Sequence, residues 1–207
     1  METPMETPTL EIKFFDEQLH NIHLTGEVGE EMLKFLEERL AEIYAVDNAV
    51  AMNNYAALNS IGIDASINLP SIFIQLTTFG GDVYAALGIY DMIKNLQKNY
   101  NVNIICNGYV MSAGTIILLA VDKKHRFSYN NSTFLLHALS SIQVGKIKQL
   151  EEETAEGKRL HNIIWEIYRK EAKIPEETLN DIYEKKLDMF IDAKRAKKWG
   201  LINEILT

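Results

Sequence analysis

Short β-rich runs alternate with helical segments along the middle of this chain, and this alternation constrains the fold more than any other feature. Residues 71–76 (SIFIQL), 101–106 (NVNIIC) and 133–137 (TFLLH) are each typical of a strand. Apolar residues recur at helical spacing in 83–93, and 112–121 (SAGTIILLAV) is apolar enough for a buried helix. Strands and helices in this order predict an α/β fold with a largely parallel sheet covered by helices on both faces.

Both ends of the chain add elements to this predicted sheet. Residues 21–27 and 30–44 predict a strand followed by a helix, which together form one βα unit. Near the C terminus, 189–191 predict a short strand, 193–199 a helix that Asp192 caps, and 201–206 a last strand.

Glycines mark two predicted turns. The sequence TTFGG, ending in Gly80–Gly81, breaks the strand that begins at Ser71, and Asn107–Gly108 forms a turn after the next strand.

Two segments stand apart from the α/β pattern. Residues 46–70 are rich in Asn and Ala and lack a sustained period, so they predict an inserted loop with room for a short helix. The charged segment 146–173 has no Pro before Pro175 and predicts one long helix, followed by a second helix that starts with acidic residues. The two helices would form a projecting hairpin, residues 146–187, whose thin apolar stripe favours a partner helix over packing on its own domain.

Composition excludes several classes of protein. The 207 residues, 47% hydrophobic and 24% charged, suit a single domain spanning 1–207, with 1–9 predicted to be disordered. A net charge of -8 disfavours nucleic acid as a partner, and one cysteine indicates a reducing, cytoplasmic setting. No stretch predicts a signal peptide, a membrane span, a zinc site or a nucleotide-binding loop, so we expect no membrane, metal or cofactor.

Three side chains are candidates for chemistry, although each also has an ordinary structural reading. Ser112 begins a predicted helix, where it is either a helix cap or a nucleophile beside free amides. His137 ends a strand, as a packed residue or as a base, and Asp188 is a turn residue or the partner of that base. Taken singly, each signal is weak.

Taken in order, however, these residues lie in motifs that resemble the proteolytic subunit of the ATP-dependent Clp protease. The motifs are TTFGGDVYAALGIYDMI, GYVMSAGTIILLA, STFLLHA and DMFIDAKRAKKWGLINEI. The resemblance implies a ClpP/crotonase-like fold, with a parallel-sheet head, flanking helices and a projecting handle. It also implies a triad of Ser112, His137 and Asp188, and an oxyanion hole formed by the backbone amides of Gly81 and Ala113.

The same resemblance implies a serine endopeptidase that cleaves unfolded proteins or peptides inside a chamber made of two stacked heptameric rings. An AAA+ unfoldase would feed this chamber, and ATP would be used by that partner rather than by this chain. The chain departs from the family pattern at Phe79, where Pro is usual, at Ala138–Leu139, where Gln-Pro is usual, and at its start, METPMETPTLEIKFF.

Three alternatives remain open at this point. The chain could be a structural or regulatory ring subunit that assembles with an active paralogue, or a phage capsid-maturation-type protease of the same family. A related fold with acyl-thioester chemistry, as in enoyl-CoA hydratase-like enzymes, would use carboxylates where this chain offers Ser112 and His137.

Overall fold

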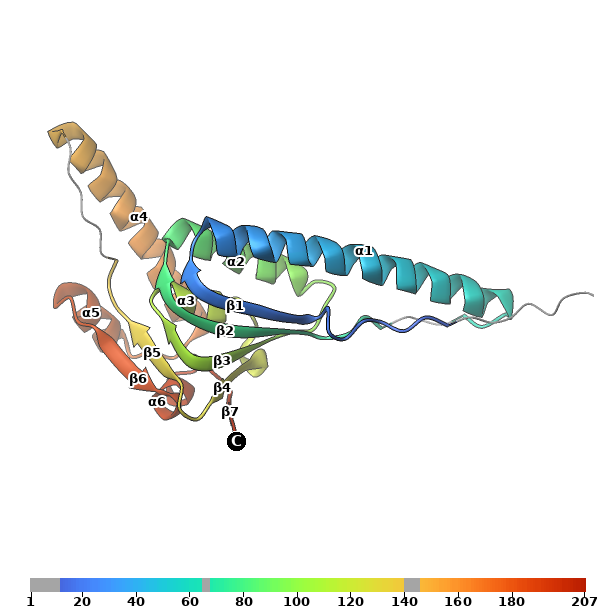
Figure 1. Cartoon of the computed structure of the whole chain (residues 1–207). Helices are drawn as coiled ribbons and strands as arrows, with labels where there is room; N and C mark the ends of the chain where they lie inside the picture. Colours follow the sequence, from blue (N-terminus) through green and yellow to red (C-terminus); the bar gives the residue numbers. More distant parts are fainter. Residues whose placement is uncertain (1–11, 65–67, 140–145) are drawn as a thin grey trace, which may run out of the picture.

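A computed structural model describes residues 12–64, 68–139 and 146–207, and its centre is a seven-stranded sheet (Figure 1). The predicted disorder of residues 1–9 lies outside the described residues. The main strand order is β1-β2-β3-β4-β7, and β5 joins β3 to β6. Every pair is parallel except β5 with β6, which confirms the predicted α/β fold. The strands are β1 (Asn21–Val28), β2 (Ile72–Gly81), β3 (Val102–Met111), β4 (Arg126–Tyr129), β5 (Thr133–Leu136), β6 (Met189–Asp192) and β7 (Glu204–Leu206).

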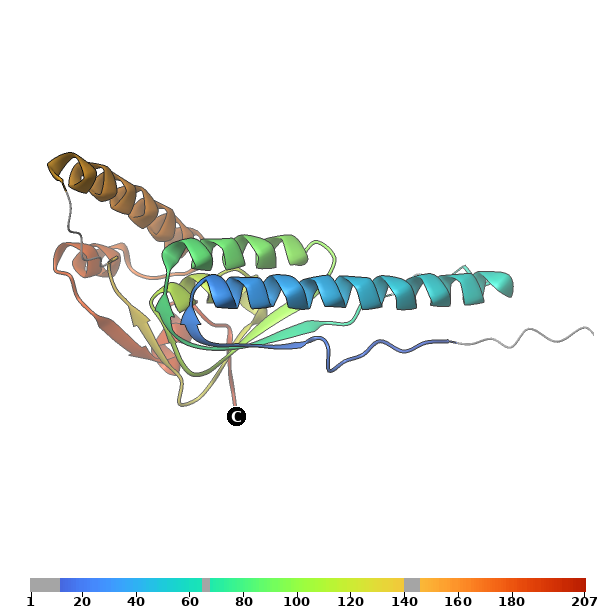
Figure 2. The same ribbon diagram turned by 45° about the horizontal axis from the view of Figure 1, so that its top comes forward.

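Three helices cover one face of the sheet at its first strands. Figures 1 and 2 show α1, α2 and α3 together on one side of β1, β2 and β3, while α4 projects away from the head. The helices are α1 (Glu30–Ser60), α2 (Val83–Leu96), α3 (Ala113–Leu118), α4 (Ile147–Glu171), α5 (Glu176–Glu184) and α6 (Ala193–Lys198), with a 3-10 turn at Lys123–His125.

The expectation of helices on both faces is wrong for β1 and β2. Ile72, Ile74 and Leu76 of β2 are buried, whereas Phe73 and Phe79 on the opposite face are exposed. Strand β1 alternates in the same way over its first residues. Alternation of buried and exposed residues is typical of a strand that is covered on one face only. The sequence did not reveal this alternation, because apolar residues occur on both faces of the predicted run 71–76.

The predicted loop over 46–70 is also largely wrong, because α1 continues without interruption to Ser60. Its buried face runs on through Ile43, Asp47, Val50 and Asn54, which is helical spacing. Two of these four residues are polar, so the period does not appear in a hydrophobicity pattern. In Figures 1 and 2 this second half of α1 extends past the strands on the side away from α4.

Both predicted glycine turns lie inside strands. Strand β2 runs through Thr77–Gly81, and β3 runs through Asn107–Gly108, where Gly108 has a φ of +71°. This local kink lets β3 pair with β4 through residues 104–106 and with β5 through 109–111. Strand β4 was not predicted, and β7 is shorter than the predicted 201–206.

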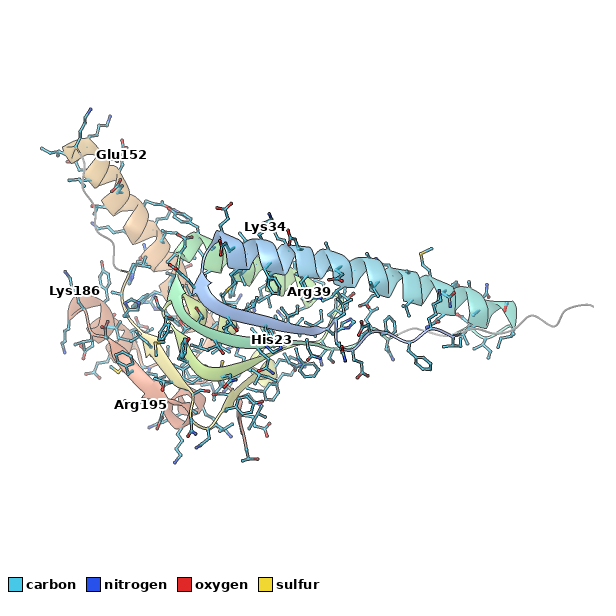
Figure 3. The ribbon with its side chains drawn as sticks, viewed as in Figure 1. His23, Lys34, Arg39, Glu152, Lys186 and Arg195 are labelled. Carbon is cyan, nitrogen blue, oxygen red and sulfur yellow. The ribbon has the colours of Figure 1, made fainter. Side chains whose placement is uncertain are left out.

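Helices α4 and α5 occupy most of the predicted hairpin segment 146–187. The expectation that this segment would not pack on its own domain is wrong for the inner half of α4, since Leu160, Ile164, Trp165 and Tyr168 are buried, whereas Ile147 at the outer end is 79% exposed. Figure 3 shows Glu152 near that outer end and Lys186 just past α5. The predicted cap of α6 is confirmed, because the Asp192 carboxylate accepts a hydrogen bond from the Arg195 amide.

Candidate active site

Strand register brings the three candidate side chains to one edge of the sheet. Ser112 directly follows β3, His137 directly follows β5, and Asp188 directly precedes β6. Parallel pairing of β3 with β5 aligns the ends that carry Ser112 and His137, and antiparallel pairing of Leu136 with Met189 sets His137 opposite Asp188. The positions predicted from separate motifs therefore converge in space.

Ser112 adopts a backbone conformation that L-residues rarely take. Its φ is +52° and its ψ is −125°, and its amide donates to the Leu135 carbonyl at 2.9 Å. Its hydroxyl makes no capping hydrogen bond to α3. Ser112 therefore does not cap α3 with its side chain. Because the helix does not engage the hydroxyl, the hydroxyl can face the cleft that Ser112 lines.

The Ser112 hydroxyl lies against His137. Nε2 of His137 is 2.6 Å from Oγ of Ser112, which is a short hydrogen bond. On the other side of the ring, Nδ1 is 3.8 Å from Oδ1 of Asp188, within electrostatic range but too long for a hydrogen bond. The Asp188 side chain is 66% exposed, so this third contact has room to tighten.

Two backbone segments complete the site. Gly80, with a φ of +99°, lies so close to the serine that a Cβ placed on it would be 2.6 Å from Cβ of Ser112. Gly81 and Ala113 line the same cleft as Ser112 and His137. Ala113 is the first residue of α3, and amides in the first turn of a helix have no acceptor within that helix.

This cleft has a volume of about 90 Å³, and both polar and apolar groups line its walls. Val83, Ile116, Ile164 and Trp165 contribute side chains from α2, α3 and α4. A second hollow of about 590 Å³ continues from His137 past Tyr183 and Lys186 to Asp188. The two hollows share His137, so an extended molecule could lie across the serine.

Sequence reasoning missed two polar residues next to the site. Tyr168 of α4 lines the cleft, and its hydroxyl lies 2.6 Å from Oγ1 of Thr115. Burial raises the pKa of Tyr168 to about 12. No motif pairs these residues, which are 53 positions apart, so only the fold could reveal them.

Other kinds of site find no support in the part of the chain that the structure describes. Within residues 12–64, 68–139 and 146–207 there is no group of three His, Cys, Asp or Glu side chains that could hold a metal ion. Among these same residues, no helix combines the length and the apolar character needed to cross a membrane.

Comparison with known proteins places the chain in a family. The family model described as Clp protease matches residues 27–207. The proteins named ATP-dependent Clp protease proteolytic subunit of Deinococcus radiodurans and Chlorokybus atmophyticus are similar. The first is 34% identical over 127 residues, which is 61% of this chain and 60% of the relative. The second is 32% identical over 136 residues, which is 66% of this chain and 59% of the relative.

The chain thus spans about 60% of the length of the curated relatives that it matches. Among solved structures, a variant of ClpP1 from Listeria monocytogenes is similar in fold. It has a TM-score of 0.70 at 24% identity and covers 91% of this chain and 92% of its own. The family match over residues 27–207 and this shared fold lead to one conclusion: the chain belongs to the Clp protease family.

Proposed function

We propose that this chain is a serine-type endopeptidase that cleaves the peptide bonds of unfolded proteins or peptides. The observation that carries this proposal is the 2.6 Å contact between Nε2 of His137 and Oγ of Ser112. A serine hydroxyl is a weak nucleophile unless an adjacent base accepts its proton, and His137 is in position to do so. Membership of the Clp protease family supports the same reaction class.

The catalytic steps follow from the positions of these groups. His137 accepts the Ser112 proton as Oγ attacks the scissile carbonyl, and the Asp188 carboxylate stabilises the resulting imidazolium. The oxyanion of the tetrahedral intermediate accepts hydrogen bonds from the amides of Gly81 and Ala113. His137 then donates its proton to the leaving amine, and a water molecule repeats the sequence to release the acyl group.

Asp188 reaches its working position only after a small movement. Its carboxylate is 3.8 Å from Nδ1 of His137, and a shift of about 1 Å would form a hydrogen bond of about 2.8 Å. Catalytic contacts are often long in a free enzyme and shorten when substrate binds. Substrate binding or subunit assembly would therefore strengthen this contact in the active particle.

From the size of the cleft we also propose a preference for substrates with an apolar side chain next to the cleaved bond. A volume of about 90 Å³ between Val83, Ile116 and Trp165 would hold one apolar side chain next to the scissile bond. Phe79 and Tyr109, whose rings stack at 3.9 Å, stand where β2 and β3 approach the site. Because Phe79 is 66% exposed, it could contact the peptide backbone or a neighbouring side chain of the substrate.

The proposed assembly is a pair of stacked heptameric rings that encloses these clefts. The outer half of α4 supports it, because Ile147 and Leu150 border an exposed hollow of about 400 Å³. Handles of opposed subunits would cover this surface. We further propose a cytoplasmic particle fed by an AAA+ unfoldase, with no cofactor bound to this chain and ATP used by the partner.

A fluorophosphonate probe, which forms a covalent adduct with activated serines, tests the proposed activity. We expect the purified chain to be labelled at Ser112, and the Ser112→Ala variant to show neither labelling nor cleavage of a fluorogenic peptide. Native mass spectrometry of the same sample measures the ring assembly. An assembled wild-type particle without labelling would refute the peptidase proposal, and a monomer with full activity would refute the chamber.

A further inference from the structure

Two buried hydroxyl groups connect the handle helix α4 to the residue that carries the nucleophile. The Tyr168 hydroxyl lies 2.6 Å from Oγ1 of Thr115, and Oγ1 of Thr115 lies 2.7 Å from the carbonyl oxygen of Ser112. The Thr115 residue is fully buried and Tyr168 is 3% exposed. Tyr168 belongs to α4 and Thr115 to α3, so this short chain of hydrogen bonds joins two separate elements.

The direction of these hydrogen bonds follows from the number of protons. A carbonyl oxygen can only accept, so Thr115 donates its single hydroxyl proton to Ser112. Oγ1 of Thr115 must then accept from the Tyr168 hydroxyl. Burial raises the pKa of Tyr168 to about 12, so the phenol keeps its proton at neutral pH. Hydrogen bonds in such a series polarise one another and become stronger.

The Ser112 carbonyl and the Ala113 amide are two ends of the same planar peptide group. No cis peptide occurs among the described residues, so the carbonyl and the amide of this group point in opposite directions. The Ser112 carbonyl accepts from both the hydroxyl and the amide of Thr115, the latter at 2.9 Å. With the carbonyl held toward the interior of α3, the Ala113 amide faces away from it, on the side of the cleft that Ala113 lines.

We propose that Tyr168 and Thr115 are positioning residues that hold the Ser112–Ala113 peptide group so that the Ala113 amide meets the oxyanion. This inference rests on the proposed peptidase function. Ser112 has an unusual backbone conformation, with a φ of +52°. The two hydrogen bonds would hold this conformation in place, because a relaxed backbone would turn the peptide group. Neither residue touches the reacting atoms, so their effect is transmitted through the orientation of one amide.

Removal of single hydroxyl groups tests this arrangement. Tyr168→Phe keeps the ring that lines the cleft, and Thr115→Val keeps the side-chain volume. Since loss of an oxyanion donor lowers kcat by about 10²–10³-fold, misalignment of one donor should lower it by about 5–50-fold. We expect KM to stay within about twofold, because the cleft walls do not change.

Three further variants separate positioning from a general loss of structure. Thr115→Ser retains the hydroxyl and should restore most of kcat. The double variant Tyr168→Phe/Thr115→Val should be no slower than Thr115→Val alone, because both changes break the same series of hydrogen bonds. Tyr55→Phe, at an exposed tyrosine of α1, is the matched control and should keep wild-type kinetics.

A peptide boronic acid, which forms a tetrahedral adduct on the serine, provides the second readout. Its affinity should fall in parallel with kcat/KM across these variants, since both report on transition-state stabilisation. Tyr168→Phe with an unchanged kcat, or with a raised KM at constant kcat, would overturn the proposed positioning role alone. A wild-type chain that neither reacts at Ser112 nor cleaves peptides would overturn the proposed function and this inference together.

Discussion

Asp47 lies at the centre of a buried polar cluster that fastens the long helix α1 to the head, and we predict that Asp47→Ala destabilises the protein strongly. Oδ2 of Asp47 lies 2.9 Å from Nε2 of His20 and accepts from the Tyr100 hydroxyl at 2.8 Å. The His20 ring is anchored on its other side, where Nδ1 donates to the Asp16 carbonyl at 2.7 Å. These groups are closed to solvent, since Asp47 is fully buried, His20 is 1% exposed and Tyr100 is 5% exposed.

The magnitude follows from what the substitution leaves behind. Without the carboxylate, His20 and Tyr100 each keep a buried polar atom that no water can reach. An unsatisfied buried group costs about 1–3 kcal/mol, so two such groups lower the free energy of unfolding by about 3 kcal/mol or more. At about 2–4 °C per kcal/mol for a chain of this length, we expect Tm to fall by about 6–12 °C.

Thermal melting monitored by circular dichroism measures this change, and Glu38→Ala provides the matched control. Glu38 is an acidic residue on the same helix, but its pair with Lys34 at 3.8 Å is exposed to solvent. Exposed pairs contribute less than about 1 kcal/mol, so this control should melt close to the wild type. Hydrogen exchange should accelerate in residues 48–60 of the Asp47→Ala variant, because the buried Asp47 lies just before that half of α1.

Tyr100→Phe tests how much a single hydroxyl group of this cluster contributes to stability. In the wild-type background it removes one hydrogen bond and should cost about 1–2 kcal/mol. In the Asp47→Ala background it removes an unsatisfied hydroxyl and should have no destabilising effect. If Asp47→Ala melts within about 2 °C of Glu38→Ala, or if Tyr100→Phe costs the same in both backgrounds, the cluster does not hold the helix on the head.

The structure also predicts the results of three further substitutions and of one chemical treatment. Gly80→Ala places a methyl group 2.6 Å from Cβ of Ser112 at a φ of +99°, so fluorophosphonate labelling should be lost while Tm falls. Gly157→Ala meets no atom within 4 Å on helix α4 and should raise the unfolding free energy by about 0.5–1 kcal/mol in a urea titration. Arg126→Lys should cost about 3 kcal/mol or more in the same titration, because the fully buried guanidinium donates to several carbonyls that a single ammonium cannot all reach. Burial raises the pKa of the Cys106 thiol, so iodoacetamide should modify it only after denaturation, as mass spectrometry of the intact chain would reveal.

The candidate catalytic constellation was predictable because its residues sit at element boundaries that the sequence marks. Ser112 stands between a β-rich run and an apolar helix, and His137 and Asp188 flank short apolar runs. The family motifs supplied their order. Their spatial approach depends on strand register, which sequence patterns do not specify, and the kink at Gly108 that splits the pairing of β3 reads in the sequence as an ordinary turn.

The second half of α1 shows where a hydrophobicity pattern fails. Its buried stripe passes through Asp47 and Asn54, which are polar residues that bury well only because specific partners meet them. Asn54 donates to the Lys13 carbonyl at 2.8 Å and accepts from the Lys13 amide at 2.9 Å. Such partners come from distant segments of the chain, so the sequence pattern around 46–60 resembles a loop until the fold is known.

The direction of the parallel strands places the buried polar cluster around Asp47 and the candidate catalytic groups at opposite ends of the sheet. His20 precedes β1 and Tyr100 precedes β3, whereas Ser112 and His137 follow the C-terminal ends of β3 and β5. A change in the cluster therefore acts on the stability of α1 and not on the geometry of the serine. Because distant sites without shared partners behave additively, Asp47→Ala combined with Tyr168→Phe should show the separate effects of each on Tm and on kcat.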